Sequence, residues 1–199
     1  IALSLFAQGT PKYVFYFIGD GMGVNQVNGT ETYLAALEGR IGVKPLLFTS
    51  FPAVGLATTF SATNGVTDSA AAGTALATGE KTKNGAIGVL ADQKTPASSV
   101  ATWAKDAGAA VGVATSVSVD HATPAAFYAH VGGRNSYYTI GKHLIEANFD
   151  FYAGSDFMEP VGSGDLQKEG TLYAQCEDAG YRLARGVKDF SKKFKKGKK

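Results

Sequence analysis

Three short polar segments of the sequence contain residue types that bind cations or anions. The first is Gly19-Asp20-Gly21, which directly follows an apolar run. A carboxylate between glycines suits a hard cation, because glycine lets the backbone approach the ion closely. The same arrangement is typical of an Asp that caps the following helix or turn. By itself, Asp20 indicates either a metal ligand or a cap.

The second segment is Asp68-Ser69, which stands in front of an Ala-rich stretch, 70–78, that we expect to be a helix closed by Gly79. The N–H groups and the dipole at the start of a helix favour an anion. They would stabilise a serine alkoxide or a phosphoryl group bound at Ser69. The alternative is an ordinary helix N-cap, a role that either residue can fill.

The third segment is Asp120-His121-Ala122-Thr123-Pro124, followed by Arg134 eleven residues after Thr123. Pro124 is typical of the first helical position, which predicts that Thr123 is the N-cap. His121 and Thr123 alternate along an extended chain and therefore point the same way, toward a hydrated metal. The fork of Arg134 fits two phosphate oxygens, although a surface Arg at a helix end is the plain alternative.

Alternating strands and helices must position these segments. Apolar runs predict strands at 12–18, 53–60, 109–115 and 149–153, the first of them buried on both faces. Helical spacing predicts helices at 24–39, 70–78, 96–107, after Pro124, at 137–147 and at 172–183. The pattern indicates an α/β fold: a three-layer, doubly wound, largely parallel central sheet with helices on both faces. Asp20 and the 120–123 segment follow strands, where such sheets gather their chemistry.

Composition excludes several classes of protein. The 199 residues are 45% hydrophobic and 18% charged, which argues against wholesale disorder. No apolar run approaches the ~20 residues that span a bilayer. Residues 188–199 contain seven Lys and one Asp, so the other 187 residues carry a net charge of −4. We expect this lysine-rich segment to be a solvated surface and not a nucleic-acid site, because no aromatic-interleaved basic patch accompanies it.

The chain ends and the cysteine content bear on the compartment. Ile1–Gly9 is apolar with a small residue at Ala7, which predicts the remnant of a secretory signal peptide over residues 1–9 and therefore export. Cys176 is the single cysteine, so it makes no internal disulfide and no cysteine-based metal site. We expect it to be a small buried hydrophobe in a helix.

Together these segments resemble the alkaline phosphatase family. The resemblance runs from about Lys12 to Gly154 and is weaker beyond. The matching stretches are Ile18-Gly19-Asp20-Gly21-Met22-Gly23, then Val66 to Ala75 with Thr78 to Thr82, then His121 to Ala126 and on through His130 to Arg134. The order and spacing of the stretches also fit the family.

The resemblance implies a role for each matching residue. Asp20 would bridge a zinc and a magnesium ion, and Thr123 would ligate the magnesium. Ser69 would be the nucleophile and also a zinc ligand. The implied reaction is the metal-dependent hydrolysis of phosphate monoesters through a phosphoserine intermediate.

Two further residues complete the implied phosphate site. Asp68 would orient Arg134, and Arg134 would hold the phosphate. His121 stands where some family members have Asp and others His, so the third metal would be magnesium or a third zinc beside the two zinc ions. The resemblance also implies small phosphate monoesters and inorganic phosphate as partners, a secreted or periplasmic location and a homodimer as one assembly.

One part of the family's site has no counterpart in this sequence. The family takes zinc ligands from its carboxyl-terminal half, and the histidines here are His121, His130 and His143, the last two in helical patterns and expected to be structural. We therefore expect residues 10–199 to be the amino-terminal part of the catalytic domain, binding zinc poorly and turning over slowly or not at all alone. The alternatives are a phosphodiesterase-type relative and a non-catalytic metal- or phosphate-binding module.

Overall fold

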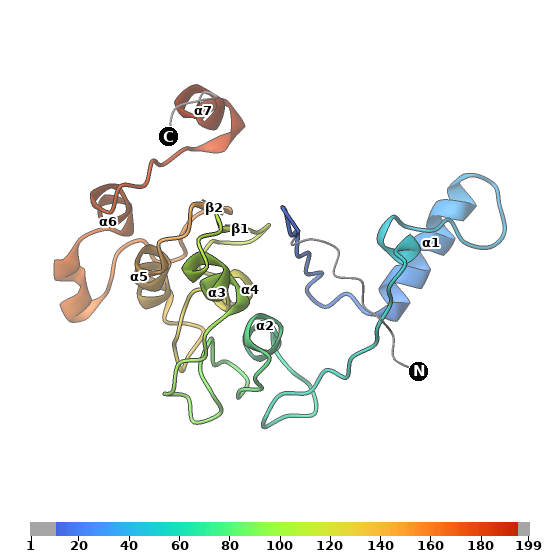
Figure 1. Cartoon of the computed structure of the whole chain (residues 1–199), viewed down its shortest axis with the longest axis horizontal. Helices are drawn as coiled ribbons and strands as arrows, with labels where there is room; N and C mark the ends of the chain where they lie inside the picture. Colours follow the sequence, from blue (N-terminus) through green and yellow to red (C-terminus); the bar gives the residue numbers. More distant parts are fainter. Residues whose placement is uncertain (1–10, 195–199) are drawn as a thin grey trace. The chain divides into compact units, whose positions relative to one another are not determined.

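The computed structural model describes residues 11–194, which fall into two compact units divided between Leu56 and Ala57. Figure 1 shows the chain with its helices and strands labelled. The predicted signal-peptide remnant at 1–9 lies outside the described residues, as does the end of the lysine-rich segment, 195–199.

The first unit is organised around helix α1, Val24–Leu37. The helix begins after Gly23, whose N–H donates to the side-chain oxygen of Gln26 at 3.0 Å. It ends before Gly39, which has a φ of +69° and marks the predicted stop. Glu31 on α1 accepts hydrogen bonds from Leu46 N and Thr49 Oγ1, which tie the short 3-10 helix η1, Phe48–Ser50, to α1.

Two predicted strands are wrong. Residues 12–18 and 53–60 belong to no strand, and Phe15 and Phe17 are 78% and 87% exposed instead of buried. A buried strand needs neighbours that pair its N–H and C=O groups and cover its side chains. Among the described residues, no strand pairs with either run. The apolar composition of these runs was therefore not enough to make them part of a sheet.

The second unit contains a two-stranded parallel sheet. Strand β1, Gly112–Ala114, pairs with β2, Phe151–Ala153, in the register Gly112↔Phe151 and Ala114↔Ala153 (Figure 1). Both strands fall within predicted runs, 109–115 and 149–153. The parallel pairing with helices in between establishes an α/β unit, as predicted, with a sheet of two strands in the described part of the chain.

The second unit also contains seven described helices. They are α2 (Ser69–Thr78), α3 (Val100–Asp106), α4 (Ala122–Ala125), α5 (Tyr137–Ala147), the 3-10 helix η2 (Gly164–Glu169), α6 (Leu172–Asp178) and α7 (Gly186–Lys193). The core joins the small residues of α2 and α4 to Ile87, Ile140, Leu144 and Phe149. Among the described residues, no helix has the length and apolar content to cross a membrane.

Two helix boundaries differ from the predictions. Helix α3 begins at Val100, with Ser99 as its N-cap, and Pro96 instead pairs with Val89 in an isolated bridge. The hydroxyl of Ser99 accepts the N–H of Thr102. This capping hydrogen bond fixes the start of the helix more directly than a proline upstream of it does. The last predicted helix, 172–183, ends at Asp178, because Gly180 adopts a φ of +91°.

Candidate active site

Asp68 and Arg134 form the centre of the candidate site. Nη1 of Arg134 lies 3.0 Å from Oδ2 of Asp68, and both side chains are about three-quarters buried. Oδ2 also accepts the N–H of Gly85 at 3.1 Å, and Oδ1 accepts the N–H of Ala71 at 3.0 Å. Burial by itself would raise the pKa of Asp68, but these two N–H groups and Arg134 lower it below its usual value. The carboxylate is therefore ionised and holds the guanidinium in place.

Asp68 is also the N-cap of α2, so Ser69 is the first residue of that helix. The helix runs from Ser69 to Thr78 and closes at Gly79, which has a φ of +80° as predicted for a C-cap. Ser69 is half-buried. A serine hydroxyl at this position faces the N-terminal end of the helix dipole, which favours negative charge. The arrangement suits an oxygen nucleophile beside an anion.

His121 contacts the same guanidinium. Nη2 of Arg134 lies 3.3 Å from Nε2 of His121. Because an arginine only donates, Nε2 accepts and the ring hydrogen lies on Nδ1, which is buried without a hydrogen-bond partner. His121 is the N-cap of α4, and Thr123 is its second residue, so the prediction of Thr123 as N-cap is wrong. Pro124 is tolerated at the third position because the first N–H groups of a helix need no intrahelical partner.

Close packing of α2 against α4 brings these segments together. A Cβ atom placed on Gly73 would lie 3.1 Å from Cβ of Ala126 and 3.6 Å from Cα of Thr123. Glycine at this position of α2 therefore lets the backbone of α4 approach, in a helix interior where glycine otherwise costs about 1 kcal/mol. The sequence motif around Ser69 thus includes a residue whose role is packing.

Asp20 belongs to the first unit. It is exposed and stands in a turn between Gly19 and Gly21, where Met22 N donates to Gly19 O at 3.1 Å and Gly21 has a φ of +74°. The second unit contains the other five predicted site residues. Contacts connect Asp68, Arg134 and His121, and Ser69 and Thr123 lie close to them in the chain, on α2 and α4.

Two residues next to the site, Asn84 and Gly85, are not among the predicted site residues. Asn84 donates from Nδ2 to Val66 O at 3.0 Å, and the neighbouring Gly85 donates its N–H to Asp68. Together they hold the loop that leads into Ser69. The Asn-Gly dipeptide predicts a turn, and Gly85 has a φ of +86°. The sequence does not reveal that this turn contacts a segment 17 residues away.

The side chains of the described residues meet the needs of a metal site only in part. His121 brings an imidazole, the kind of ligand that zinc prefers, but its Nδ1 must lose the ring hydrogen before that nitrogen can bind a metal. However, no group of three or more His, Cys, Asp or Glu side chains gathers into a metal-binding cluster in the described part of the chain. The second unit supplies single donors, and they do not form a complete ligand set.

Comparison with known proteins gives one consistent result. A family model described as alkaline phosphatase matches residues 11–150. The tissue-nonspecific alkaline phosphatase of Gallus gallus is 37% identical over 150 residues, which are 70% of this chain and 29% of that protein. The isozyme of Mus musculus is 33% identical over 188 residues, 89% of this chain and 31% of that protein. The chain spans about 30% of the length of these relatives.

Solved structures that superpose on this chain are also alkaline phosphatases. A cold-active alkaline phosphatase from the psychrophile Shewanella sp. superposes with a TM-score of 0.68 at 33% identity, covering 84% of this chain and 40% of that one. The alkaline phosphatase of the Antarctic bacterium TAB5 superposes with a TM-score of 0.67 at 31% identity, covering 82% and 46%. Variants of the TAB5 enzyme with Asp or Glu in place of a histidine hold magnesium at a site called M3.

Proposed function

Because the chain belongs to the alkaline phosphatase family, we propose that it contributes the phosphate-binding and nucleophilic part of a phosphomonoesterase. The observation that carries this proposal is the Asp68–Arg134 ion pair, 3.0 Å long, beside the first residue of α2. A guanidinium held by Asp68, the residue that precedes a serine at a helix N-terminus, supports the proposal. Both features favour a doubly charged phosphoryl group.

In the proposed reaction, Arg134 binds two phosphoryl oxygens while Asp68 holds its guanidinium in place. Oγ of Ser69 forms a bond to phosphorus, the bond from phosphorus to the substrate oxygen breaks, and the alcohol leaves with a proton. Water then cleaves the phosphoserine and releases inorganic phosphate. The contacts made here are to the transferred group, so the reaction accepts a range of small phosphate monoesters.

The metal ions of the proposal are two zinc ions and one magnesium ion or third zinc. Ser69, His121, Thr123 and Asp20 are the residues of this chain that would hold them. When bound, such ions lower the pKa of a coordinated hydroxyl and neutralise charge on phosphoryl oxygens. The magnesium held at the M3 site of the TAB5 variants supports a cation site in the proposed enzyme. The imidazole of His121 supports such a role in this chain once its ring hydrogen has left Nδ1.

The organisation that we propose follows from the same resemblance. Residues 10–199 form the amino-terminal part of a catalytic domain with a three-layer, doubly wound sheet, in a secreted or periplasmic protein. The parallel β1–β2 pair supports this proposal as one element of such a sheet.

The test is Ser69→Ala in the protein produced from the complete coding sequence, hereafter the full-length protein. With p-nitrophenyl phosphate, we expect turnover to fall by about a thousandfold or more, because the nucleophile is lost. Ser98→Ala is the matched control, because Ser98 is exposed and stands outside the site. A phosphorylated Ser69 peptide in acid-quenched wild-type protein would identify the intermediate.

The alternatives give different results in the same assay. A diesterase would hydrolyse bis(p-nitrophenyl) phosphate faster than the monoester. A non-catalytic binding module would show no turnover in the wild type and would keep its affinity for phosphate in Ser69→Ala. Either result would contradict the proposed function.

A further inference from the structure

Two histidines outside the candidate site form a connected pair. Nδ1 of His143, on α5, accepts the backbone N–H of His130 at 3.1 Å, and the two rings lie 6.3 Å apart. Nδ1 of His130 lies 2.6 Å from the carbonyl oxygen of Gly88. His130 therefore links α5 to the 87–88 segment, and it lies in the extended segment after α4, not in the helix that its sequence pattern suggests.

The hydrogen bonds assign a proton to one nitrogen of each ring. His143 accepts at Nδ1, so its hydrogen lies on Nε2, which faces the carboxylate of Glu146 at 4.0 Å. A carbonyl oxygen only accepts, so His130 carries its hydrogen on Nδ1. Burial is the largest influence on the pKa of His143 and lowers it. His130 and Lys142 act in the same direction, and together these effects outweigh Glu146, which raises the pKa. A neutral His143 is the form that can accept the amide hydrogen.

This pair fixes the segment that leads to Arg134. Immediately after His130, the N–H and C=O of Val131 both pair with Ile87 at 2.9 Å. Gly88 permits the close approach: it has a φ of +58°, and a Cβ atom there would lie 1.9 Å from the carbonyl oxygen of Ala129. The strap, residues 130–134, is therefore held on one side by residues 87–88 and on the other by His143.

We propose that His143 is a positioning residue for Arg134, which acts by accepting the His130 amide hydrogen and thereby fixing the strap that carries the guanidinium. The proposal rests on the proposed function, because it takes phosphate as the ligand of Arg134. Losing the acceptor would leave the part-buried His130 N–H without a partner, and the strap would shift to satisfy it. A guanidinium displaced in this way binds phosphoryl oxygens less well.

Two variants of the full-length protein separate the acceptor from the ring. His143→Phe keeps a ring but has no acceptor, whereas His143→Asn places a side-chain oxygen near the position of Nδ1. With p-nitrophenyl phosphate as substrate and inorganic phosphate as inhibitor, we expect His143→Phe to raise KM and Ki by about threefold to tenfold, the size typical of one lost hydrogen bond. We expect kcat to change less, and His143→Asn to stay near wild type.

Two results with these variants would overturn the proposal. One is an unchanged Ki for phosphate in folded His143→Phe. The other is a Ki in His143→Asn that rises as much as in His143→Phe, because the size of the side chain and not its acceptor atom would then matter. Circular dichroism establishes whether each variant is folded.

A measurement on the wild type serves if His143→Phe does not fold. Imidazole 15N shifts should show His143 protonated at Nε2 and His130 protonated at Nδ1, and a proton on Nδ1 of His143 would overturn the proposal. Saturating inorganic phosphate should slow amide exchange at His130, because coupling between two sites is reciprocal. Unchanged exchange on bound phosphate contradicts the positioning role, whereas absence of phosphate binding contradicts the proposed function instead.

Discussion

At the residue scale, the two carboxylate oxygens of Asp68 accept hydrogen bonds from different groups. Oδ1 caps α2 through Ala71 N, and Oδ2 joins the Gly85 N–H and Arg134. One carboxylate therefore fixes the helix that begins at Ser69 and the arginine beside it. Asp68 therefore fits both interpretations of its motif, the N-cap of α2 and the residue that holds Arg134. Because one side chain does both, the sequence alone cannot distinguish the two interpretations.

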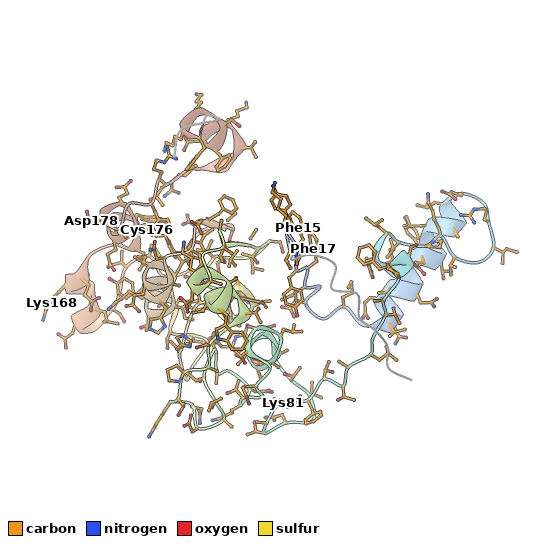
Figure 2. The ribbon with its side chains drawn as sticks, in the orientation of Figure 1. Phe15, Phe17, Lys81, Lys168, Cys176 and Asp178 are labelled. Atoms are coloured by element: carbon orange, nitrogen blue, oxygen red, sulfur yellow. The ribbon has the colours of Figure 1, made fainter. Side chains whose placement is uncertain are left out.

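Cys176 gives a prediction about reactivity. It is the single cysteine of the chain and is 3% exposed on α6, where Figure 2 labels it together with Asp178. Burial raises the pKa of its thiol to about 11. At pH 8 only about one thiol in a thousand is then ionised, so we expect native protein to react slowly with iodoacetamide and urea-unfolded protein to react quickly. Mass spectrometry measures the adduct, and equal rates in both states would contradict the prediction.

His143 gives a prediction about pH. Its pKa is lowered in the folded state, chiefly by burial, so the unfolded chain binds the proton more tightly. The stability that follows is fully present above the unfolded pKa of about 6.5, and it is lost as the pH falls through the lower folded value. Urea unfolding at pH 7.5 and 5.0 should show a larger loss for wild-type full-length protein than for His143→Asn. Equal losses would mean that His143 does not titrate in this way.

At the element scale, the site depends on how closely α2 and α4 pack. Small residues line the contact on both helices: Ala70, Gly73 and Ala77 on α2, Ala122 and Ala125 on α4, and Ala126 at the C-cap of α4. Because α4 has four residues, it has little intrinsic stability and takes its position from this contact. The positions of His121 and Thr123 therefore follow from packing against α2.

Gly73→Val tests this dependence. Its side chain would overlap Ala126, so we expect the free energy of unfolding to fall by about 1–3 kcal/mol, as in other overpacked cores. Gly29→Ala is the control: Gly29 lies inside α1 with open space around it, and the change should raise stability by about 0.5–1 kcal/mol. Urea unfolding measures both. A Gly73→Val protein as stable as wild type would show that α4 moves away without cost.

At the scale of the whole molecule, the described chain exposes an aromatic run in its first unit. Phe15 and Phe17 stack on one another with ring centroids 6.5 Å apart, and both are exposed (Figure 2). An extended, uncharged and β-prone run of this kind favours association between chains. We therefore expect this surface of the first unit to promote association between copies of the 199-residue chain.

The double variant Phe15→Lys, Phe17→Lys tests this expectation. We expect it to lower concentration-dependent light scattering of the 199-residue chain, because charge on an exposed strand-like run opposes pairing. The matched control adds the same charge on α1 at Tyr33 and Leu37, which are also exposed. Equal reduction by both double variants would mean that net charge, and not the aromatic run, controls association.

The sequence by itself determined the local structures whose signals lie within a few residues. The Ala-rich run with Gly79 behind it gave α2, the runs at 109–115 and 149–153 gave the paired strands, and the motifs around Asp20, Ser69 and Arg134 indicated the family. Propensity and capping act over single turns, so a short window of sequence contains them.

Only the tertiary structure decided the rest, because it depends on partners far away in the chain. Whether the run 12–18 is a buried strand depends on neighbours, and the described residues provide none. The Gly85 N–H at Asp68 and the His130 N–H at His143 join segments 17 and 13 residues apart, and no local pattern marks either pair. Buried polar groups must find a partner, but which partner they find is settled only when the chain packs.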